Sequence, residues 1–420
     1  MEAVTEEQPV QQTPVTQENE TADNDTKVQV FTDEVSKVTI AVEGCCHGEL
    51  DAIYNTVKEI EEKHDKNIDL VLLCGDVQAA RNQADMASMA MPPTYRTLGD
   101  FHQYYNGEKK APYLTIIIGG NHEAALYFWE MPFGGWIAPN IYYLGFAGVV
   151  NYGGLRIMGL SGIFKHYNYF KGHWEAPPFT DNHLVKKKSY YHIKEYQIWR
   201  MSLLTGNFDV ALSHDWPTGV YNHGDKQTLL RMKPYFRQEV YSNRLGNPHG
   251  KYLLDKLQPK YWFSAHLHVK FAAVCPHTHN NKETKFLALD KCLPGKHFLQ
   301  VVDVDCSSEG EKKLTYDPEW LAITKMTWRF WPSNHWQLTD EMKAILTVDD
   351  ETLSWVKKEF NGNYEIPLNF EKTASLDSEE VKLTPITDFT QNPQTMALMK
   401  RLGIFPTPIE PEANPEEIEL

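Results

Sequence analysis

Five short apolar runs, each followed by glycine or histidine within two residues, recur through the first two thirds of the chain. They cover residues 38–42, 70–74, 114–118, 208–213 and 261–265, and a sixth run of the same kind covers residues 155–160. Continuous apolar runs of this length are typical of strands that are buried on both faces of an α/β sheet. After the first run, the apolar residues follow the spacing of an amphipathic helix: Leu50, Ile53, Tyr54, Val57 and Ile60. The pattern therefore predicts an α/β fold.

The second half of the chain continues with a different pattern. Residues 271–274, 286–289 and 298–302 are predicted as successive antiparallel strands that complete a second sheet. Residues 275–281 contain Cys275, His277 and His279 in a polar stretch, which we interpret as a solvated turn and not as a ligand site. Residues 306–405 carry helical patterns near 340–360 and 391–402 and five tryptophans, at positions 320, 328, 331, 336 and 355. We expect an α-rich layer packed on the core.

Charge is concentrated at the two ends of the chain. Residues 1–35 hold nine acids and one lysine, and residues 406–420 hold five acids and no base, so the ends carry −8 and −5 of the net charge of −15. Both ends are rich in polar residues and proline, which predicts disordered acidic tails. We therefore expect a catalytic domain at 36–304 and a C-terminal domain at 305–405. The near-neutral body does not exclude a nucleic-acid partner.

Targeting signals are not evident. No apolar run approaches the roughly 18 residues of a membrane helix, and the first residues do not form a signal peptide. The six cysteines are irregularly spaced, which argues against a secreted disulfide framework. We expect a soluble intracellular chain with reduced thiols and no membrane partner. The run of three lysines at 186–188 is too short to count as an import signal.

Residue types that bind metals follow the five apolar runs. Ligands bind at the carboxyl ends of strands in open α/β sheets, so these residues are predicted to converge. The candidates are Cys45, His47, Asp76, Asn121, His122, His214, His266 and His268. Seven of them suffice for two metal ions if Asp76 bridges, because an ionised carboxylate has two oxygens. Packed core histidines and a buried cysteine are the alternative interpretation.

Two metal ions held about 3.5–4 Å apart can clamp the attacking and leaving oxygens of a displacement at phosphorus. A water shared by the ions would be acidified and become the nucleophile. His122 is then free to act as the general acid that protonates the departing oxygen. A sulfur ligand disfavours Mg²⁺ and favours Zn²⁺ or Fe²⁺.

Residues 161–200 differ in composition from the rest of the chain. They contain ten aromatic residues and seven Lys or Arg against three acids. Aromatic faces that stack on unpaired bases, mixed with cations that meet phosphates, are what recognition of single-stranded RNA requires. Residues 190–199 fit a helix, and there we favour packing in the core. For residues 164–179, packing and RNA contact both stay open.

The spacing of these motifs resembles the calcineurin-like metallophosphoesterases over roughly residues 37–304. Their pattern runs Asp-x-His, Gly-Asp, Gly-Asn-His-Glu, His and Gly-His-x-His, and this chain has Cys45 in place of the aspartate and Ala265 in place of the glycine. The cysteine, within residues 44–50, resembles the RNA lariat debranching enzymes. The resemblance continues at residues 213–217, 236–240, 261–271, 286–294 and 392–395.

This resemblance implies an αββα sandwich of two mixed sheets with a helix-rich C-terminal domain. It implies hydrolysis of the 2′,5′-phosphodiester at the branch point of excised intron lariats, for intron turnover in the nucleus. One metal would be held by Cys45, His47, Asp76 and His268, and the other by Asp76, Asn121, His214 and His266, with Fe²⁺ and Zn²⁺, or Mn²⁺, as the ions. Residues 161–200 would be the lariat recognition loop, in which we expect Lys165, Tyr169 and His173 to contact branched RNA. We expect a monomer.

Two other functions fit the same core. A phosphatase or nucleotide phosphodiesterase would turn over small phosphate esters at least as well as branched RNA, but the aromatic and basic segment argues against it. A non-catalytic RNA-binding module would lack a ligand, and none is missing.

Overall fold

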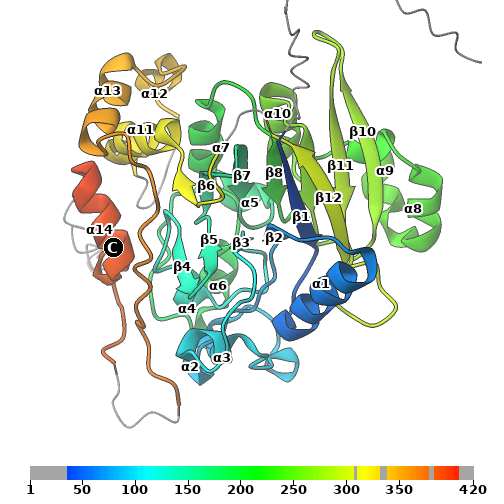
Figure 1. The fold of residues 1–420 in the computed structure, drawn as a ribbon, viewed down its shortest axis with the longest axis horizontal. Coiled ribbons are helices and arrows are strands. Elements are labelled where there is room, and N and C mark those ends of the chain that lie inside the picture. Colours follow the sequence, from blue (N-terminus) through cyan, green and yellow to red (C-terminus); the bar gives the residue numbers. More distant parts are fainter. Residues whose placement is uncertain (1–35, 307–309, 332–337, 378–382, 406–420) are drawn as a thin grey trace, which may run out of the picture. The chain divides into compact units, whose positions relative to one another are not determined.

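Two mixed β-sheets lie face to face, with helices on their outer faces (Figure 1). A computed structural model describes residues 36–306, 310–331, 338–377 and 383–405. The first sheet has the strand order β12 (Leu299–Asp305), β1 (Lys37–Glu43), β2 (Leu70–Leu73), β3 (Thr115–Ile117), β5 (Ile141–Tyr143) and β4 (Gly135–Ala138). Strands β1, β2, β3 and β5 are parallel, whereas β12 and β4 run antiparallel to their neighbours.

The second sheet is also mixed. Its order is β10 (Phe271–His277), β11 (Lys282–Ala288), β9 (Tyr261–Ser264), β8 (Val210–Ser213), β7 (Leu155–Leu160), β6 (Ala147–Tyr152) and β13 (Thr315–Tyr316). Strands β11, β9, β8 and β7 are parallel, and β10, β6 and β13 are antiparallel to their partners. In both sheets the parallel strands occupy the centre.

Helices cover the sheets and fill the connections. The first sheet is covered by α1 (Leu50–His64), α2 (Gln83–Ser88), α3 (Phe101–Asn106) and α4 (Ala125–Phe128). The connection from β7 to β8 contains α5 (His166–Tyr169), α6 (Leu184–Tyr190) and α7 (Glu195–Ser202), and that from β8 to β9 contains α8 (Lys226–Met232), α9 (Arg237–Tyr241) and α10 (Pro248–Leu257). The C-terminal helices are α11 (Pro318–Thr327), α12 (Asp340–Ala344), α13 (Asp350–Glu359) and α14 (Pro393–Leu402).

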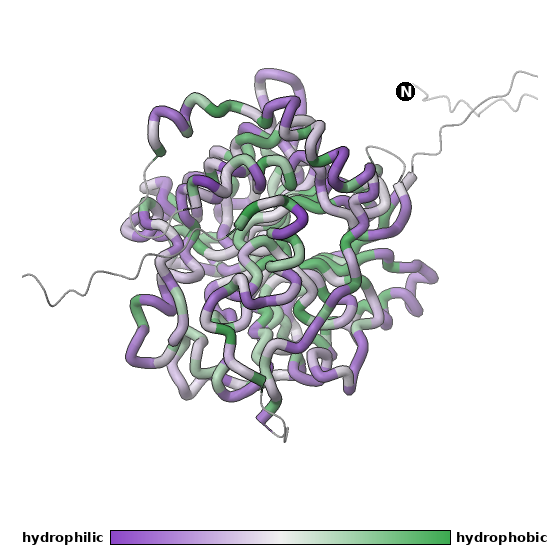
Figure 2. The backbone as a smooth tube through the Cα atoms, turned by 90° about the vertical axis from the view of Figure 1, so that its left-hand side faces the viewer, coloured by the Kyte–Doolittle hydropathy of each residue, from purple (hydrophilic) through white to green (hydrophobic). Residues whose placement is uncertain are grey.

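Buried apolar residues form three layers, which confirms the predicted αββα sandwich. Neighbouring residues of one strand enter different layers, because side chains alternate between the faces of a sheet. In β1, Ile40 packs between the two sheets, whereas Ala41 packs against the helices of the first sheet. Figure 2 shows hydrophobic stretches gathered in the interior and hydrophilic ones along the outer loops. Burial on both faces explains why the central strands are continuous apolar runs.

The C-terminal region is fastened to the first sheet by side chains. The Gln394 amide accepts a hydrogen bond from Trp136 N at 2.7 Å and donates one to Trp136 O at 2.9 Å, which covers part of the edge strand β4. The buried Arg81 lies 2.8 Å from both Glu130 and Thr373. The helices predicted within 340–360 and 391–402 are present as α12, α13 and α14. Trp336 lies outside the described residues.

One sequence-based expectation about the later strands was wrong, and another is confirmed. Residues 299–305 do not extend the second sheet but form β12, the antiparallel neighbour of β1 in the first sheet. The chain crosses between the sheets at residues 289–298, where Gly44 N donates to Phe298 O at 3.0 Å. The other two predicted strands pair antiparallel as expected, β10 with β11, and β11 also pairs in parallel with β9. Local periodicity identifies a strand but not the sheet edge that receives it.

Residues 275–281 also differ from the expected solvated turn. Cys275 and His277 belong to β10 and are buried, and the His277 ring lies 2.8 Å from the Thr284 hydroxyl. His279 is exposed in the turn, as expected. The predicted acidic tails lie outside the described residues. Within the described part of the chain, each helix is too short or too polar to cross a membrane.

Candidate metal centre

All eight candidate residues stand in loops that leave the carboxyl ends of parallel strands. Cys45 and His47 follow β1, and Asp76 follows β2. Asn121 and His122 follow β3, His214 follows β8, and His266 and His268 follow β9. The two sheets stack with these ends together, and the structure brings the candidates to one edge of the sandwich.

Four of these residues form a compact group. Cys45, His47, Asp76 and His268 each offer one ligand atom, and these atoms lie within 4.8 Å of one another. The Nε2 atoms of His47 and His268 are 3.3 Å apart, and His47 Nε2 lies 3.9 Å from Asp76 Oδ2. The Cys45 sulfur accepts a hydrogen bond of 3.2 Å from His266 N. Soft sulfur, two imidazoles and a carboxylate make a donor set for a divalent transition metal.

A second group shares Asp76. His214 Nε2 lies 3.3 Å from Asp76 Oδ2, and the His214 and His266 ring centroids are 5.1 Å apart. Within the described part of the chain, three buried atoms here have no hydrogen-bond partner: Asp76 Oδ2, Asn121 Oδ1 and His214 Nε2. Buried polar atoms are normally paired, because desolvation without a partner is costly. A cation between them would satisfy all three, so the residues present fit a second metal.

Hydrogen bonds behind the ligands orient the imidazole rings. His214 Nδ1 lies 2.7 Å from the Cys74 carbonyl oxygen, to which it donates, and this leaves the Nε2 lone pair free. His47 Nδ1 lies 2.7 Å from the Gln78 side-chain amide, which fixes the second ring. Both rings thus turn Nε2 toward Asp76.

The ligand loops have strained backbones. His47, Asp76, His266 and His268 adopt positive φ angles of 52°, 52°, 64° and 49°. Residues other than glycine seldom adopt such angles, and where they do the strain tends to mark functional sites. The loops also approach one another closely, since a Cβ atom on Gly120 would lie 2.2 Å from Asp76 Oδ1. Only glycine fits there, which explains one of the two glycines after β3.

Glu123 holds two ligand loops together. Its carboxylate is buried and accepts hydrogen bonds of 2.9 Å from the backbone N atoms of Val77, Gln78 and Gly120. These atoms belong to the loops that carry Asp76 and Asn121. Burial and the nearby Asp76 charge raise the pKa of Glu123 to about 7. Sequence reasoning gave this residue no role, although its place directly after Asn-His was a signal.

The pKa values of the candidate ligands are shifted in different directions. Burial alone would raise the pKa of Asp76, but the neighbouring His214, His122 and His47 hold it well below its ordinary range. Burial lowers the pKa of His266 to about 3 and that of His268 to about 4, so both rings are neutral, which is the form that binds metals. Burial and the Asp76 charge raise the pKa of the Cys45 thiol, and a bound cation would favour its thiolate.

His122 lies beside the four-residue group and outside it. Its ring centroid is 5.5 Å from that of His47, and its backbone N donates to Asp76 Oδ1 at 2.8 Å. Its Nδ1 atom is buried and has no hydrogen-bond partner among the described residues. The ring thus borders the metal centre without belonging to the four-residue group.

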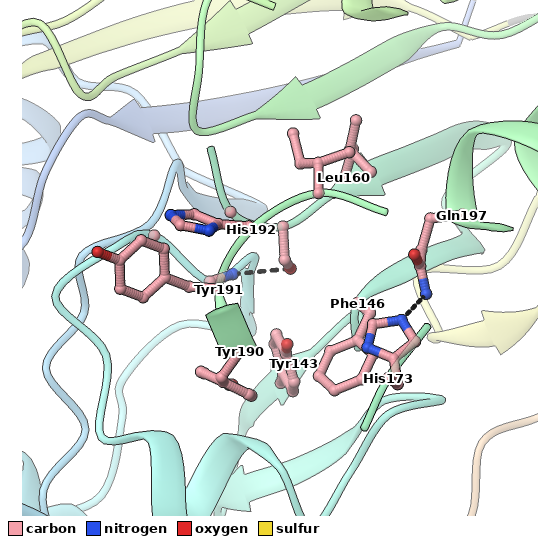
Figure 3. Close-up of a pocket in the computed structure, with 13 residues that line it drawn as sticks. Tyr143, Phe146, Leu160, His173, Tyr190, Tyr191, His192 and Gln197 are labelled. Carbon is pink, nitrogen blue, oxygen red and sulfur yellow. Dashed lines mark hydrogen bonds between the residues drawn. The ribbon is translucent and has the colours of Figure 1, made fainter. Parts of the chain in front are cut away.

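The three predicted substrate contacts differ in exposure. Lys165 is exposed at the start of α5. Tyr169 is buried and stacks on His249, with ring centroids 3.8 Å apart. His173 stacks on Phe146 with ring centroids 4.6 Å apart (Figure 3). It also packs against Trp331 in the C-terminal region. The structure brings Tyr169 and His173 into the protein interior, and neither joins the metal ligands.

The aromatic side chains of the 161–200 segment also differ in exposure. Tyr190, Tyr196 and Trp199 are buried, which confirms the packing interpretation of residues 190–199. Among residues 164–179, Tyr167 is 63% exposed and Phe170 is 46% exposed. A cavity of about 20 Å³ separates this segment from the loop after β3, and it is lined by Gly119, Gly120, Ser161, His173, His192 and Gln197. That volume has room for one water molecule.

Lys291 is a second residue that sequence reasoning missed. Its backbone forms a parallel bridge with Cys45, in the loop that crosses between the sheets. Burial lowers the pKa of His47, and the Lys291 charge adds to that effect. The Lys291 charge thus acts on His47 and His268, whereas the Lys165 charge acts on His266.

Comparison with known proteins agrees with this geometry. The model of the calcineurin-like phosphoesterases matches residues 38–270, and that of the lariat debranching enzyme C-terminal domain matches residues 281–406. Lariat debranching enzyme A of Xenopus laevis is 46% identical over 391 residues, which cover 90% of this chain and 73% of that protein. The lariat debranching enzyme of Arabidopsis thaliana is 45% identical over 368 residues, covering 87% and 86%. That of Homo sapiens is 44% identical over 393 residues, covering 90% and 71%. The chain therefore belongs to the lariat debranching enzyme family, within the calcineurin-like phosphoesterases.

Proposed function

We propose that this chain hydrolyses the 2′,5′-phosphodiester at the branch point of lariat RNA, which releases a linear strand with a free 2′-OH and a 5′-phosphate. The observation that carries the proposal is the convergence of Cys45, His47, Asp76 and His268 within 4.8 Å. Family membership supports the same reaction, because the relatives are named lariat debranching enzymes.

Two divalent cations are implied by the phosphoesterase family. We assign one to Cys45, His47, Asp76 and His268, and the other to Asp76, Asn121, His214 and His266. When bound, such ions supply Lewis-acid activation of the phosphate and of the attacking water. The sulfur donor favours Fe²⁺ and Zn²⁺, with Mn²⁺ as a substitute.

The chain's own residues perform the remaining steps. Asp76 turns Oδ2 toward both halves of the site, while its Oδ1 accepts a hydrogen bond from His122 N. Glu123 keeps the loops of Asp76 and Asn121 in register. His122 acts as the general acid, with Nε2 donating a proton to the departing 2′-oxygen. Placing the proton there avoids expulsion of an alkoxide.

Branched RNA is bound by cations and rings around the centre. Lys165 and Lys291 meet phosphates on either side of the scissile bond, and the exposed Tyr167 and Phe170 offer faces to unpaired bases. We infer from the family that the protein works in the nucleus and as a monomer. Imaging of a tagged chain and sedimentation of the purified protein test these two inferences.

The deciding experiment incubates purified protein with branched RNA, a matched linear RNA and a small phosphate ester, each with Fe²⁺, Zn²⁺ or Mn²⁺. Selective cleavage of the branch supports the proposal. Better turnover of the small ester would favour a general phosphatase, and binding without cleavage would favour an RNA-binding module. Elemental analysis that found less than one transition metal per chain would remove the two-metal site.

A further inference from the structure

Outside the metal centre, residues 226–244 form an exposed surface that is basic and aromatic. We call it the 226–244 surface; it comprises α8, the short 3₁₀ helix Pro234–Phe236 and α9. Its sequence holds five cations, Lys226, Arg231, Lys233, Arg237 and Arg244, against one acid, Glu239. The segment buries Leu229, Leu230, Phe236 and Val240. Met232, Tyr235 and Tyr241 face outward and are 50%, 69% and 74% exposed.

Cations outnumber the acids on and beside this surface, although Asp225, which precedes α8, lies close enough to Arg231 for the Arg231 charge to help lower the pKa of Asp225. Within the described ranges, none of the five cations forms an ion pair with a carboxylate. Lys226, Arg231 and Arg244 instead donate to the neutral side chains of Asn222, Thr228 and Ser242. Nearby lysines behave differently, since Lys251 pairs with Asp255 and Lys260 pairs with Asp209. A cluster of free cations with little acid around it attracts a polyanion.

The surface also stands at the edge of the sandwich that carries the metal ligands. The chain leaves the loop of His214 and returns to it, because Asn247 N donates to Trp216 O at 2.7 Å and Thr218 N donates to Asn247 O at 3.0 Å. The Trp216 indole donates to Ala265 O at 2.8 Å, next to the ligand His266. Figure 1 shows α8 and α9 beside β10, which begins just after His268. The 217–247 stretch that contains the segment is thus anchored at both ends beside the loop of His214, and Gly224 pairs with Ala273 of β10.

We propose that the 226–244 surface binds an unpaired RNA strand that flanks the branch, through stacking on Tyr235 and Tyr241 and phosphate contacts from Arg231, Lys233 and Arg237. Exposed rings require bases that are not already stacked in a helix, so a single strand fits better than a duplex. Unpaired cations supply the backbone contacts. This inference rests on the proposed function and adds a second RNA contact, separate from the 161–200 segment.

The test compares two substrates. One is a minimal branched trinucleotide, and the other is the same branch with long single-stranded arms. The variant Arg231→Gln/Lys233→Gln/Arg237→Gln should raise KM for the long substrate about tenfold, because phosphate contacts and their counterion release are lost. Its kcat on the long substrate and its kcat/KM on the trinucleotide should equal those of the wild type. Tyr235→Ala/Tyr241→Ala should show the same pattern, since each stacked base contributes about fivefold or more.

A matched control removes the same charge elsewhere: Lys343→Gln/Lys357→Gln/Lys358→Gln, on α12 and α13, should leave KM unchanged. Fluorescence anisotropy with single-stranded RNA measures binding without cleavage. There the slope of log affinity against log salt should become shallower by roughly 2, at about 0.7 for each lost phosphate contact. Circular dichroism establishes that each variant is folded.

Three results would overturn the inference. They are an unchanged KM and RNA affinity in both variants, an equal loss on both substrates, or the same loss in the control. If the variants bind RNA as well as the wild type does, the partner of this basic surface would be an acidic protein instead of RNA. If the wild type cleaves the trinucleotide, the proposed function stands even when this inference fails. If it cleaves neither substrate, the proposed function fails, and anisotropy still decides whether the surface binds RNA.

Discussion

The metal centre and the interior of the 161–200 segment contain similar residue types. They differ in how the buried polar atoms are grouped and in which of them have hydrogen-bond partners. At the centre, Asp76 Oδ2 and His214 Nε2 are buried without a hydrogen-bond partner among the described residues. In the segment, the buried Lys194 lies 2.8 Å from Glu175 and 3.0 Å from Ser189, and His173 is stacked and bonded to Gln197. The segment also holds buried atoms without a hydrogen-bond partner in the described part of the chain, at Trp174 Nε1 and Arg200 Nε, but they are not grouped around one carboxylate as those at the centre are around Asp76. Chemistry is therefore indicated where several such groups converge, and residue type alone does not identify them.

Removing the shared carboxylate should break the centre most completely. Asp76→Asn loses the charge that serves both groups of ligands, so we expect loss of bound metal and of branch cleavage beyond detection. Elemental analysis and a cleavage assay measure the two effects, with Asp303→Asn on β12 as a surface control. Full metal content in Asp76→Asn would contradict the bridging role.

His122→Ala should separate proton transfer from metal binding. Loss of a general acid costs about 10²–10⁴-fold in rate, and the metal content should stay intact because His122 lies outside the four-residue group. Single-turnover cleavage and elemental analysis measure both quantities. If metal is lost in proportion to activity, His122 is a ligand instead.

A substitution in the interior of the 161–200 segment should lower the free energy of unfolding and leave kcat unchanged. Lys194→Ala leaves the buried Glu175 carboxylate without its cation, which is expected to cost about 3–5 kcal/mol of the free energy of unfolding. Denaturant titration measures this loss, and kcat of the folded protein should be unchanged. Lys188→Ala, at an exposed position of α6, is the control and should have little effect. A fall in kcat with normal stability would show that the segment takes part in the reaction.

Cys45→Asp tests the chemical character of the first group of ligands. Replacing soft sulfur by oxygen should shift the metal preference toward harder ions such as Mg²⁺ and Mn²⁺. Metal titration of cleavage activity in both proteins shows the shift. An unchanged preference would mean that the Cys45 sulfur is not coordinated.

The smallest expected effect is on the pH dependence of stability and comes from Asp100, whose pKa is raised, whereas that of Asp76 is lowered. Asp100 accepts hydrogen bonds from Leu50 N and Asp51 N at the start of α1, and burial raises its pKa to about 6. A raised carboxyl pKa means that its stabilisation is present below the unfolded pKa and is lost as pH rises through about 6. The wild type should therefore lose about 2 kcal/mol relative to Asp100→Asn between pH 4 and 7. Denaturant titrations at both pH values measure this difference, and parallel curves would contradict it.

Much of the fold could be predicted from the sequence, because its signals are local. The apolar runs became β1, β2, β3, β7, β8 and β9, and the spacing from Leu50 to Val57 became the buried face of α1. The placement of residues 299–305 could not be predicted, because strand pairing depends on contacts far apart in sequence. The same holds for Glu123 and Lys291, whose roles come from loops that meet only after folding.

The sequence by itself determined which residue types follow which strands, and hence the set of candidate ligands at one edge of an α/β fold. The tertiary structure alone decided which of them stay unsatisfied, which histidines and tyrosines are packed away, and where the 226–244 surface stands. The physical reason is that periodicity and motif spacing act over a few residues. Burial, hydrogen-bond partners and neighbouring charges are set by segments that come together from distant parts of the chain.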